Sequence, residues 1–153
     1  MAKLDIETFK TVVDSTPLIS IDLLVENEKG EYLFGLRKNR PAKDYWFVPG
    51  GRVQKNETLD AAFRRLTQEE LGVELERSHA QFKGVYEHFY QDSVFGEEVS
   101  THYVVLAYVI KISSDIINFD ESQHSKMIWH DLHNQEIKNI HPYTKAYFEG
   151  IEC

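Results

Sequence analysis

Apolar and polar residues repeat along the chain with two different periods, and these periods predict where helices and strands lie. Residues 5–14 place apolar side chains at helical spacing, with Asp5 suited to cap the helix start. Residues 58–71 show the same spacing more clearly, with Thr58 suited to the N-cap and Gly72 to the C-terminal end. We therefore expect an N-terminal helix and a second, better-defined helix near the middle of the chain.

Runs of β-branched and aromatic residues separated by polar turns predict the strands. Towards the end of the chain, residues 131–138 and 142–149 have helical patterns, and Pro142 suits a helix start. The expected strands are 18–26, 31–37, 81–90, 99–112 and 125–130. This order predicts a fold of the α/β or α+β class, in which a mixed, mostly antiparallel sheet is sandwiched between helices.

Composition narrows the class of protein. With 153 residues, the chain is long enough for one domain with its own core. Its 25 acidic and 17 basic residues give a net charge of −8, which argues against nucleic acid as a partner, because phosphate contacts need a basic surface. The single cysteine, Cys153, excludes an internal disulfide, and no segment has the pattern of a signal peptide or a membrane span. We therefore expect a cytoplasmic protein without membrane contact.

The negative charge is unevenly distributed. Residues 35–55 contain a single acidic residue, Asp44, against six basic ones: Arg37, Lys38, Arg40, Lys43, Arg52 and Lys55. A local cationic region on an acidic protein attracts a small anionic ligand, while the remainder repels long polyanions. The charge pattern is therefore compatible with a small phosphate-bearing substrate.

Two carboxylates, Glu69 and Glu70, stand at the C-terminal end of the helix expected at 58–71, where the helix dipole disfavours negative charge. Arg65 lies one turn before Glu69 and can pair with it, whereas Glu70 borders the apolar face. A carboxylate held at the border of a core can bind a hard cation such as Mg²⁺. The same residues can also form a solvated acidic helix face, and the residue types alone favour this second interpretation.

The spacing of these residues favours the metal site. Residues 51–73 resemble the Nudix box, Gly-x5-Glu-x7-Arg-Glu-U-x-Glu-Glu-x-Gly-U, in which U is aliphatic. Two positions depart from it: Leu66 replaces the Glu that follows the arginine, and Thr67 replaces the aliphatic residue. The matching residues are Gly51, Glu57, Arg65, Glu69, Glu70, Gly72 and Val73. The resemblance implies a single Nudix hydrolase domain over residues 1–153, with the Nudix fold.

Within that family the chain resembles the GDP-mannose mannosyl hydrolases. Replacement of the box Glu, here by Leu66, is itself a feature of this subfamily. The shared runs are STPLIS (15–20), NRPA (39–42), YWFVPGGRVQK (45–55), HFY (88–90), THYVVL (101–106) and the pair Gln123-His124. The departure from the general box therefore supports the specific resemblance.

The resemblance implies Mg²⁺-dependent hydrolysis of GDP-mannose to GDP and free mannose, by attack of water at the anomeric carbon with inversion. Such a reaction has an oxocarbenium-like transition state, and the whole diphosphate leaves. GDP-glucose is a further possible substrate, and polysaccharide biosynthesis is the fitting context. Two alternatives stay open: an ordinary Nudix diphosphatase that yields GMP and mannose 1-phosphate, and a nucleotide-sugar-binding module without turnover. The family is typically dimeric, so a homodimer is expected.

By the same resemblance, one Mg²⁺ per active site, with Mn²⁺ as a substitute, is held by the backbone carbonyl of Gly50 and the side chains of Glu70 and Gln123. A histidine titrates near neutral pH, as a general base must, and the resemblance assigns this role to His124. The other candidates for the base are His88 and His102. His88 is also expected at the substrate.

The remaining site residues would contact the substrate. Arg37 and Arg52 would bind the diphosphate, since a guanidinium holds phosphate oxygens bidentately, and Tyr103 would donate a hydrogen bond to it. Asp22 interrupts an apolar strand pattern, where a carboxylate is either functional or turned to solvent; the resemblance places it at the sugar. Leu4 and Phe9 are expected at the guanine, although a phenylalanine on a helix face is also an ordinary core residue.

Overall fold

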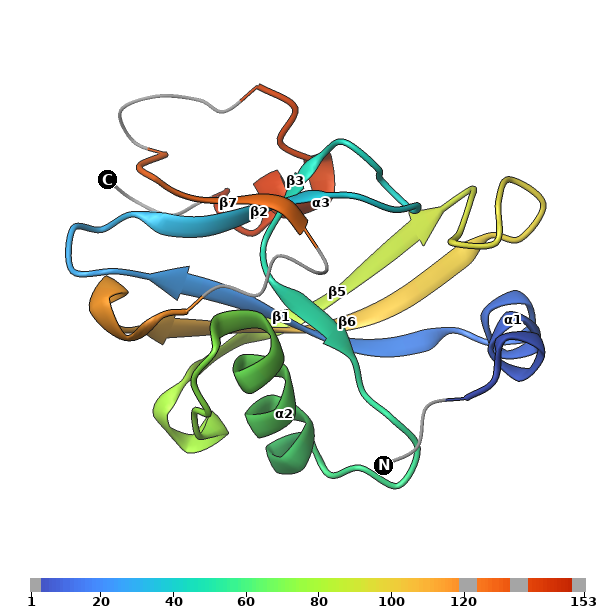
Figure 1. The fold of residues 1–153 in the computed structure, drawn as a ribbon, viewed down its shortest axis with the longest axis horizontal. Coiled ribbons are helices and arrows are strands. Elements are labelled where there is room, and N and C mark those ends of the chain that lie inside the picture. Colours follow the sequence, from blue (N-terminus) through green and yellow to red (C-terminus); the bar gives the residue numbers. More distant parts are fainter. Residues whose placement is uncertain (1–3, 119–123, 133–137, 150–153) are drawn as a thin grey trace.

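The computed structural model describes residues 4–118, 124–132 and 138–149. A seven-stranded sheet and the helices around it make up this part of the chain (Figure 1). The helical elements are α1 (Ile6–Ser15), α2 (Leu59–Leu71), η1 (Arg77–His79), η2 (Ser114–Ile116) and α3 (Pro142–Ala146). The strands are β1 (Leu18–Glu26), β2 (Tyr32–Arg37), β3 (Trp46–Phe47), β4 (Gly50–Arg52), β5 (Gln81–Tyr90), β6 (Thr101–Lys111) and β7 (His124–His130). The predicted fold class is confirmed.

The sheet is built around β1. This strand runs parallel to β6, with Leu18 opposite Tyr103 and Glu26 opposite Lys111, and β5 continues the sheet antiparallel to β6. The other edge of β1 is shared between two partners, because β2 pairs with it at Glu26 whereas β4 pairs with Ser20, Ile21 and Asp22. β2 in turn pairs with β3 and β7, both antiparallel. The sheet is therefore mixed and mostly antiparallel, as predicted.

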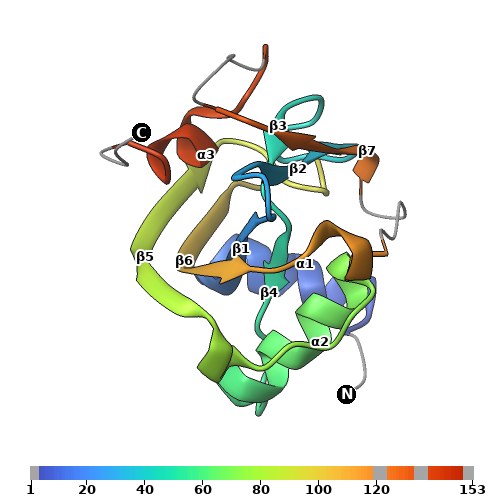
Figure 2. The ribbon, with the colours of Figure 1, turned by 90° about the vertical axis from the view of Figure 1, so that its left-hand side faces the viewer.

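Both faces of β1 are buried, which explains its almost continuous apolar sequence. Ile21 and Leu23 face the cluster that includes α2, while Leu24 belongs to a second cluster that includes Tyr147 just after α3. α2 thus covers one side of β1 and β6, while β2, β7 and α3 lie on the other (Figures 1 and 2). Because side chains alternate along a strand, Asp22 shares the face of Leu24. The carboxylate of Asp22 therefore points towards the α3 side of the core.

The ends of α2 follow from its sequence. The Thr58 side chain accepts a hydrogen bond from the Ala61 N–H at 3.1 Å, and Gly72 ends the helix in the left-handed conformation at φ 71°. Phe63 and Leu66 are buried on its apolar face, and the same face continues to Glu70, which is also buried. The helix predicted at 58–71 is therefore confirmed, and its packing fixes the position of Glu70.

Smaller differences concern the last third of the chain. The strand predicted at 99–112 covers only Thr101–Lys111, and the helix predicted at 142–149 ends at Ala146, after which Tyr147 begins a turn. Most of the helix predicted at 131–138 lies outside the described residues. In the part of the chain that is described, no helix is long and apolar enough to cross a membrane.

Candidate active site

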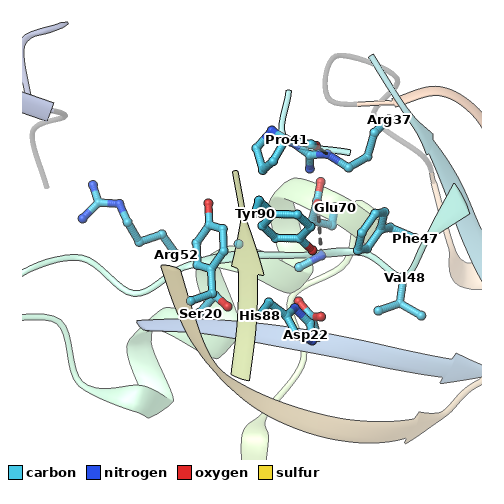
Figure 3. Close-up of a pocket in the computed structure, with 13 residues that line it drawn as sticks. Ser20, Asp22, Arg37, Pro41, Phe47, Val48, Arg52, Glu70, His88 and Tyr90 are labelled. Carbon is cyan, nitrogen blue, oxygen red and sulfur yellow. Dashed lines mark hydrogen bonds between the residues drawn. The ribbon is translucent and has the colours of Figure 1, made fainter. Parts of the chain in front are cut away.

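A pocket lies beside the middle of β1, where β4, β5, β6 and the end of α2 converge. In Figure 3, Arg37 and Pro41 lie on one side of it and Asp22 and His88 on the other. The lining residues are Ser20, Asp22, Arg37, Pro41, Phe47, Val48, Gly50, Gly51, Arg52, Glu70, His88, Tyr90 and Tyr103. The fold therefore brings together seven of the residues predicted for the site: Asp22, Arg37, Gly50, Arg52, Glu70, His88 and Tyr103.

Glu70 enters the pocket through a close approach of β4 to both α2 and β1. Its Oε1 accepts a hydrogen bond from the Gly50 N–H at 3.2 Å. A β-carbon at Gly50 would stand 2.5 Å from Asp22 Oδ1, so only glycine lets β4 lie this close to β1. The carboxylates of Glu70 and Asp22 thus flank the same stretch of backbone.

This stretch fits a hard cation in the chemistry of its donors. Glu70 is 4% exposed as a residue, and the Gly50 peptide beside it has no side chain to block an approaching ion. Among the residues that the structure describes, no three His, Cys, Asp or Glu side chains come together as a metal site of their own. From these described residues alone, a bound cation would need backbone oxygens besides carboxylates, and Gln123 of the predicted set lies outside them.

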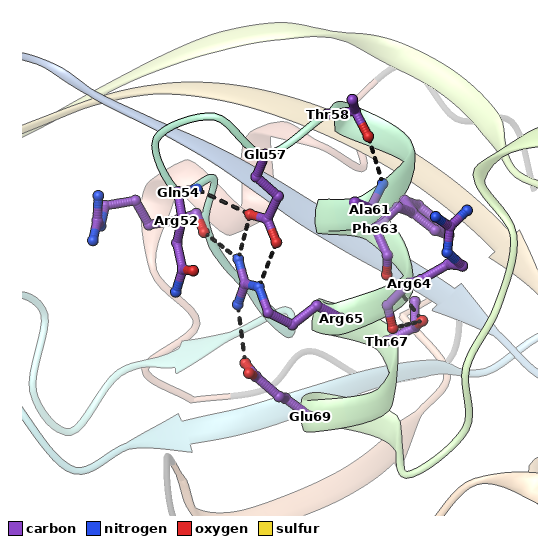
Figure 4. Close-up of polar contacts among 10 residues, drawn as sticks. All are labelled: Arg52, Gln54, Glu57, Thr58, Ala61, Phe63, Arg64, Arg65, Thr67 and Glu69. Atoms are coloured by element: carbon purple, nitrogen blue, oxygen red, sulfur yellow. Dashed lines mark hydrogen bonds and ion pairs between the residues drawn. The ribbon is translucent and has the colours of Figure 1, made fainter. Parts of the chain in front are cut away.

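Arg65 connects α2 to β4, the strand that contains Gly50 and Gly51 (Figure 4). Its guanidinium donates to Glu57 at 2.7 and 2.9 Å, to the backbone oxygen of Arg52 at 2.8 Å and to Glu69 at 3.2 Å. Glu57 in addition accepts the Gln54 N–H at 3.0 Å. The pairing with Arg65 lowers the pKa of Glu57. Three of the box residues, Glu57, Arg65 and Glu69, therefore fix the backbone around the pocket.

Asp22 lies at the end of a short chain of hydrogen bonds. The Tyr147 hydroxyl donates a hydrogen bond to Asp22 Oδ2 at 2.5 Å. The hydroxyl oxygen of Tyr147 also lies 3.3 Å from His88 Nε2. Burial raises the pKa of Asp22 to about 7, although the Tyr147 hydrogen bond and the charge of Arg37 oppose this change. Burial also lowers the pKa of His88 to about 4. The sequence-based alternative of a solvent-facing Asp22 is therefore not what the structure contains.

A comparison with family models decides the identity of this fold. The model of the NUDIX domain matches residues 16–149. The chain belongs to the Nudix family. A curated relative of this Nudix hydrolase is the low-salt glycan biosynthesis protein Agl8 of Haloferax volcanii, which is 36% identical over 146 residues, or 95% of this chain and 89% of that protein.

Solved structures agree with this assignment. The MutT NUDIX hydrolase from Burkholderia pseudomallei has a TM-score of 0.70 and 26% identity over 90% of this chain and 100% of its own. A bifunctional NMN adenylyltransferase/ADP ribose pyrophosphatase from Francisella tularensis, complexed with AMP and a Mn ion, has a TM-score of 0.56 and 20% identity over 92% of this chain and 39% of its own. The second likeness shows the fold alone. Nudix hydrolases generally use a divalent cation such as Mg²⁺ or Mn²⁺.

The N-terminal helix of this Nudix hydrolase lies at the edge of the pocket. The Arg52 guanidinium carbon stands 5.1 Å from the centre of the Phe9 ring, and Phe9 packs edge-on against Phe95. Phe9 is half-buried in a small cluster around Val13, while Leu4 is 43% exposed. Neither Leu4 nor Phe9 lines the pocket, but Phe9 contacts Arg52, which does.

The predicted metal ligand Gln123 and the predicted base His124 lie on either side of a boundary of the described residues, which resume with β7 at His124. Gln123 lies outside the described residues, and of His124 only the backbone is described, which pairs with Arg37. His102, a rival candidate for the base, stacks on Phe89 and does not line the pocket. The assignment of Gln123 and His124 to metal and base therefore stays a prediction.

Sequence reasoning missed the contribution of the segment at α3. The His88 ring stacks on Tyr143 at 4.4 Å between ring centres with 6° between planes, and Tyr147 reaches Asp22. His141 stacks on Phe47, another pocket residue, at 4.7 Å. These aromatic residues carry no motif that marks them, and they lie in and beside a short helix more than fifty residues after His88. Their weak amphipathic pattern indicated only a helix.

Proposed function

We propose that this Nudix hydrolase cleaves GDP-mannose to GDP and free mannose, by attack of water at the anomeric carbon with inversion. The observation that carries the proposal is the burial of Leu66. On the helix face that ends in Glu70, the position where the general box has a carboxylate is 2% exposed and packs against Gly51. Fewer anionic ligands on this face favour a reaction in which the cation assists a leaving group and does not generate the nucleophile.

The residues on the cationic side of the pocket suit a diphosphate leaving group. Negative charge grows on the departing diphosphate as the glycosidic bond breaks, so donors aimed at it lower the barrier. Arg37 and Arg52 line the pocket with guanidinium groups that bind phosphate oxygens bidentately. Burial raises the pKa of Tyr103, which keeps its hydroxyl protonated as a hydrogen-bond donor. When bound, the cation held by Gly50, Glu70 and Gln123 would neutralise part of the same charge.

The opposite side of the pocket suits the sugar. Asp22 and His88 lie there, and Asp22, when ionised above its pKa of about 7, would stabilise a cationic transition state near the anomeric centre. His124 is the proposed general base that takes the proton of the attacking water. Its backbone pairs with Arg37, so that β7 holds this residue beside the strand that carries a phosphate-binding arginine. This pairing supports the role but does not place the imidazole.

The relative Agl8 supports the biological context. Its name assigns it to glycan biosynthesis, and we propose a corresponding role for this chain near GDP-mannose-dependent polysaccharide synthesis. GDP-glucose is included as a possible second substrate, because it differs from GDP-mannose at one hydroxyl. The homodimer also stays a proposal, and sedimentation equilibrium of the purified protein tests it.

Hydrolysis in ¹⁸O-labelled water tests the proposed reaction. We expect Mg²⁺-dependent release of GDP, with the label in mannose and none in phosphate, and an inverted anomer in ¹H NMR spectra taken before mutarotation. Label in GMP or in mannose 1-phosphate would show the ordinary diphosphatase reaction instead. Binding of GDP-mannose without turnover would show a nucleotide-sugar-binding module.

The choice of base has its own test. His124→Gln should lower kcat by roughly 10²- to 10⁴-fold, the usual contribution of a general base, while substrate binding is retained. The exposed His79 offers a control, because His79→Gln should leave both unchanged. Full activity of His124→Gln would show that another group takes the proton.

A further inference from the structure

The Tyr147 hydroxyl lies between two pocket residues and has one proton for both of them. It stands 2.5 Å from Asp22 Oδ2 and 3.3 Å from His88 Nε2. A distance of 2.5 Å is typical of a charge-assisted O–H···O⁻ hydrogen bond. Such a bond to the Asp22 carboxylate is stronger than a bond from the same hydroxyl to the nitrogen of a neutral His88. While Asp22 is ionised, as at pH 8, the proton of Tyr147 therefore belongs to the bond with Asp22, and towards His88 the hydroxyl can only accept.

This constraint reaches the imidazole of His88. Since the Tyr147 oxygen accepts, Nε2 of a neutral His88 must carry the ring proton, and Nδ1 must be the unprotonated nitrogen. Burial lowers the pKa of His88 to about 4, so the ring is neutral under ordinary conditions. The choice of tautomer follows from the geometry of the three groups.

The surroundings hold all three groups in place. Tyr147 is fully buried, and its ring packs edge-on against Tyr86 at 4.7 Å. The His88 ring stacks on Tyr143, whose hydroxyl donates to the Phe89 carbonyl at 3.0 Å and accepts the Phe89 N–H at 3.1 Å. The segment at α3 is thereby tied to β5, so that neither ring can turn without breaking a packed contact.

We propose that Tyr147 is a positioning residue of the pocket: it orients the Asp22 carboxylate and fixes His88 as the Nε2–H tautomer, which leaves Nδ1 as an acceptor for a substrate hydroxyl. The tautomer does not depend on the reaction. The effect on turnover rests on the proposed function, since it requires Asp22 and His88 to contact the sugar.

The tautomer is measured by long-range ¹H–¹⁵N NMR of protein with ¹⁵N-labelled histidine at pH 8, with the His88 signals assigned by their loss in His88→Gln. The wild-type protein should carry the proton on Nε2. Tyr147→Phe keeps the ring and removes only the hydroxyl, so it should produce a tautomer mixture. Tyr86→Phe removes a hydroxyl from the neighbouring ring and should leave the tautomer as in the wild type.

A wild-type His88 with its proton on Nδ1 would overturn the proposal without any variant at Tyr147. An unchanged tautomer in a folded Tyr147→Phe would overturn it as well. A residue that only supports the fold would change the melting temperature and leave the tautomer alone, so the spectrum separates positioning from packing.

Steady-state kinetics with GDP-mannose test the proposed effect of Tyr147 on turnover. Tyr147→Phe should lower kcat by roughly 10- to 100-fold, as is usual when a supporting hydrogen bond of a functional group is removed, with KM changed much less. An unchanged kcat in an active enzyme would contradict the positioning role. A wild-type protein that fails to hydrolyse GDP-mannose would instead refute the proposed function, while the tautomer result would still stand.

Discussion

Leu66 lies directly against Gly51, so that a β-carbon on the glycine would stand 2.5 Å from the leucine Cδ2. The two residues connect α2 to β4, and Glu70 follows one turn later on the same face of the helix. The leucine therefore fills the space where the general Nudix box has a second carboxylate. This contact joins the core of the protein to its proposed metal site.

A variant with a carboxylate at position 66 tests whether the packed core leaves room for a second anionic metal ligand there. Leu66→Glu would bury a charge next to Glu70, and without a cation it should lower the free energy of unfolding by about 3 kcal/mol. Leu66→Gln has the same shape without the charge and should lose less. Urea unfolding with and without millimolar Mg²⁺ measures both.

The cation should stabilise Leu66→Glu more than Leu66→Gln, because only the first adds an anionic ligand. Equal stability of the two variants in the absence of a cation would mean that the carboxylate escapes to solvent. The pocket would then have more room beside Gly51 than the packing of Leu66 indicates.

Arg65 offers a second test, because its planar guanidinium joins two elements. Arg65→Lys keeps the charge but has three N–H donors, and cannot replace the four hydrogen bonds that the guanidinium makes to Glu57, Glu69 and the Arg52 carbonyl. We expect a loss of about 1–2 kcal/mol in the free energy of unfolding. We also expect a lower kcat/KM, because the strand with Arg52 loses its anchor.

The neighbouring Arg64 provides the matched control. It pairs with Glu74 and Glu76 at the exposed side of α2, at 3.7 and 3.3 Å. Arg64→Lys should change the stability by less than about 0.5 kcal/mol, as is usual for surface ion pairs. A similar loss in both variants would contradict the assignment of a special role to Arg65.

The sequence allowed most of the fold and the cationic side of the site to be predicted, for local reasons. The helix at 58–71 has its own caps, and Gly51, Glu57 and Arg65 follow one another along β4, the loop after it and that helix. Arg37 and Arg52 stand in the basic segment. The residues that interact there are close in sequence, so their spacing carries the information.

The opposite side of the pocket depends on contacts between distant segments. Asp22 and Tyr147 are 125 residues apart, and Tyr147 and His88 are 59 apart. A tyrosine in a short aromatic segment is compatible with many environments, so no local pattern indicated these contacts. The apolar run of β1 did mark Asp22 as unusual, and the structure supplies the hydrogen-bond partner that the sequence could not.

Substitution of Gly72 should destabilise the protein more than substitution of Gly30, because only Gly72 of the two has no space for a β-carbon. Gly72 has φ 71°, and a β-carbon there would collide with the carbonyl oxygen of Asn118. Gly30 has nearly the same φ, 76°, with nothing near an added β-carbon. Gly30→Ala should therefore cost only about 1 kcal/mol for the left-handed conformation, and Gly72→Ala should cost about 2 kcal/mol more. Equal losses in thermal or urea unfolding would mean that the turn around Asn118 adapts.

The pH dependence of stability should report the burial of His88. Its pKa is about 4 in the folded protein and about 6.5 in an unfolded chain. Between these values the unfolded state binds a proton that the folded state does not. The contribution of His88 is therefore fully present above pH 6.5 and is lost as the pH falls towards 4.

Asp22 acts in the opposite sense, because its raised folded pKa of about 7 makes stability decrease as the pH rises from about 4 to 7. Comparison with a variant separates the two. His88→Gln should remove roughly 2 kcal/mol of the change in unfolding free energy between pH 6.5 and pH 4, measured by urea unfolding at several pH values. The exposed His79 serves as control, since His79→Gln should keep the wild-type slope. If His88→Gln also keeps that slope, the pKa of His88 is the same in the folded and unfolded protein, and the neutral imidazole required for the Tyr147 contact would predominate only above about pH 6.5.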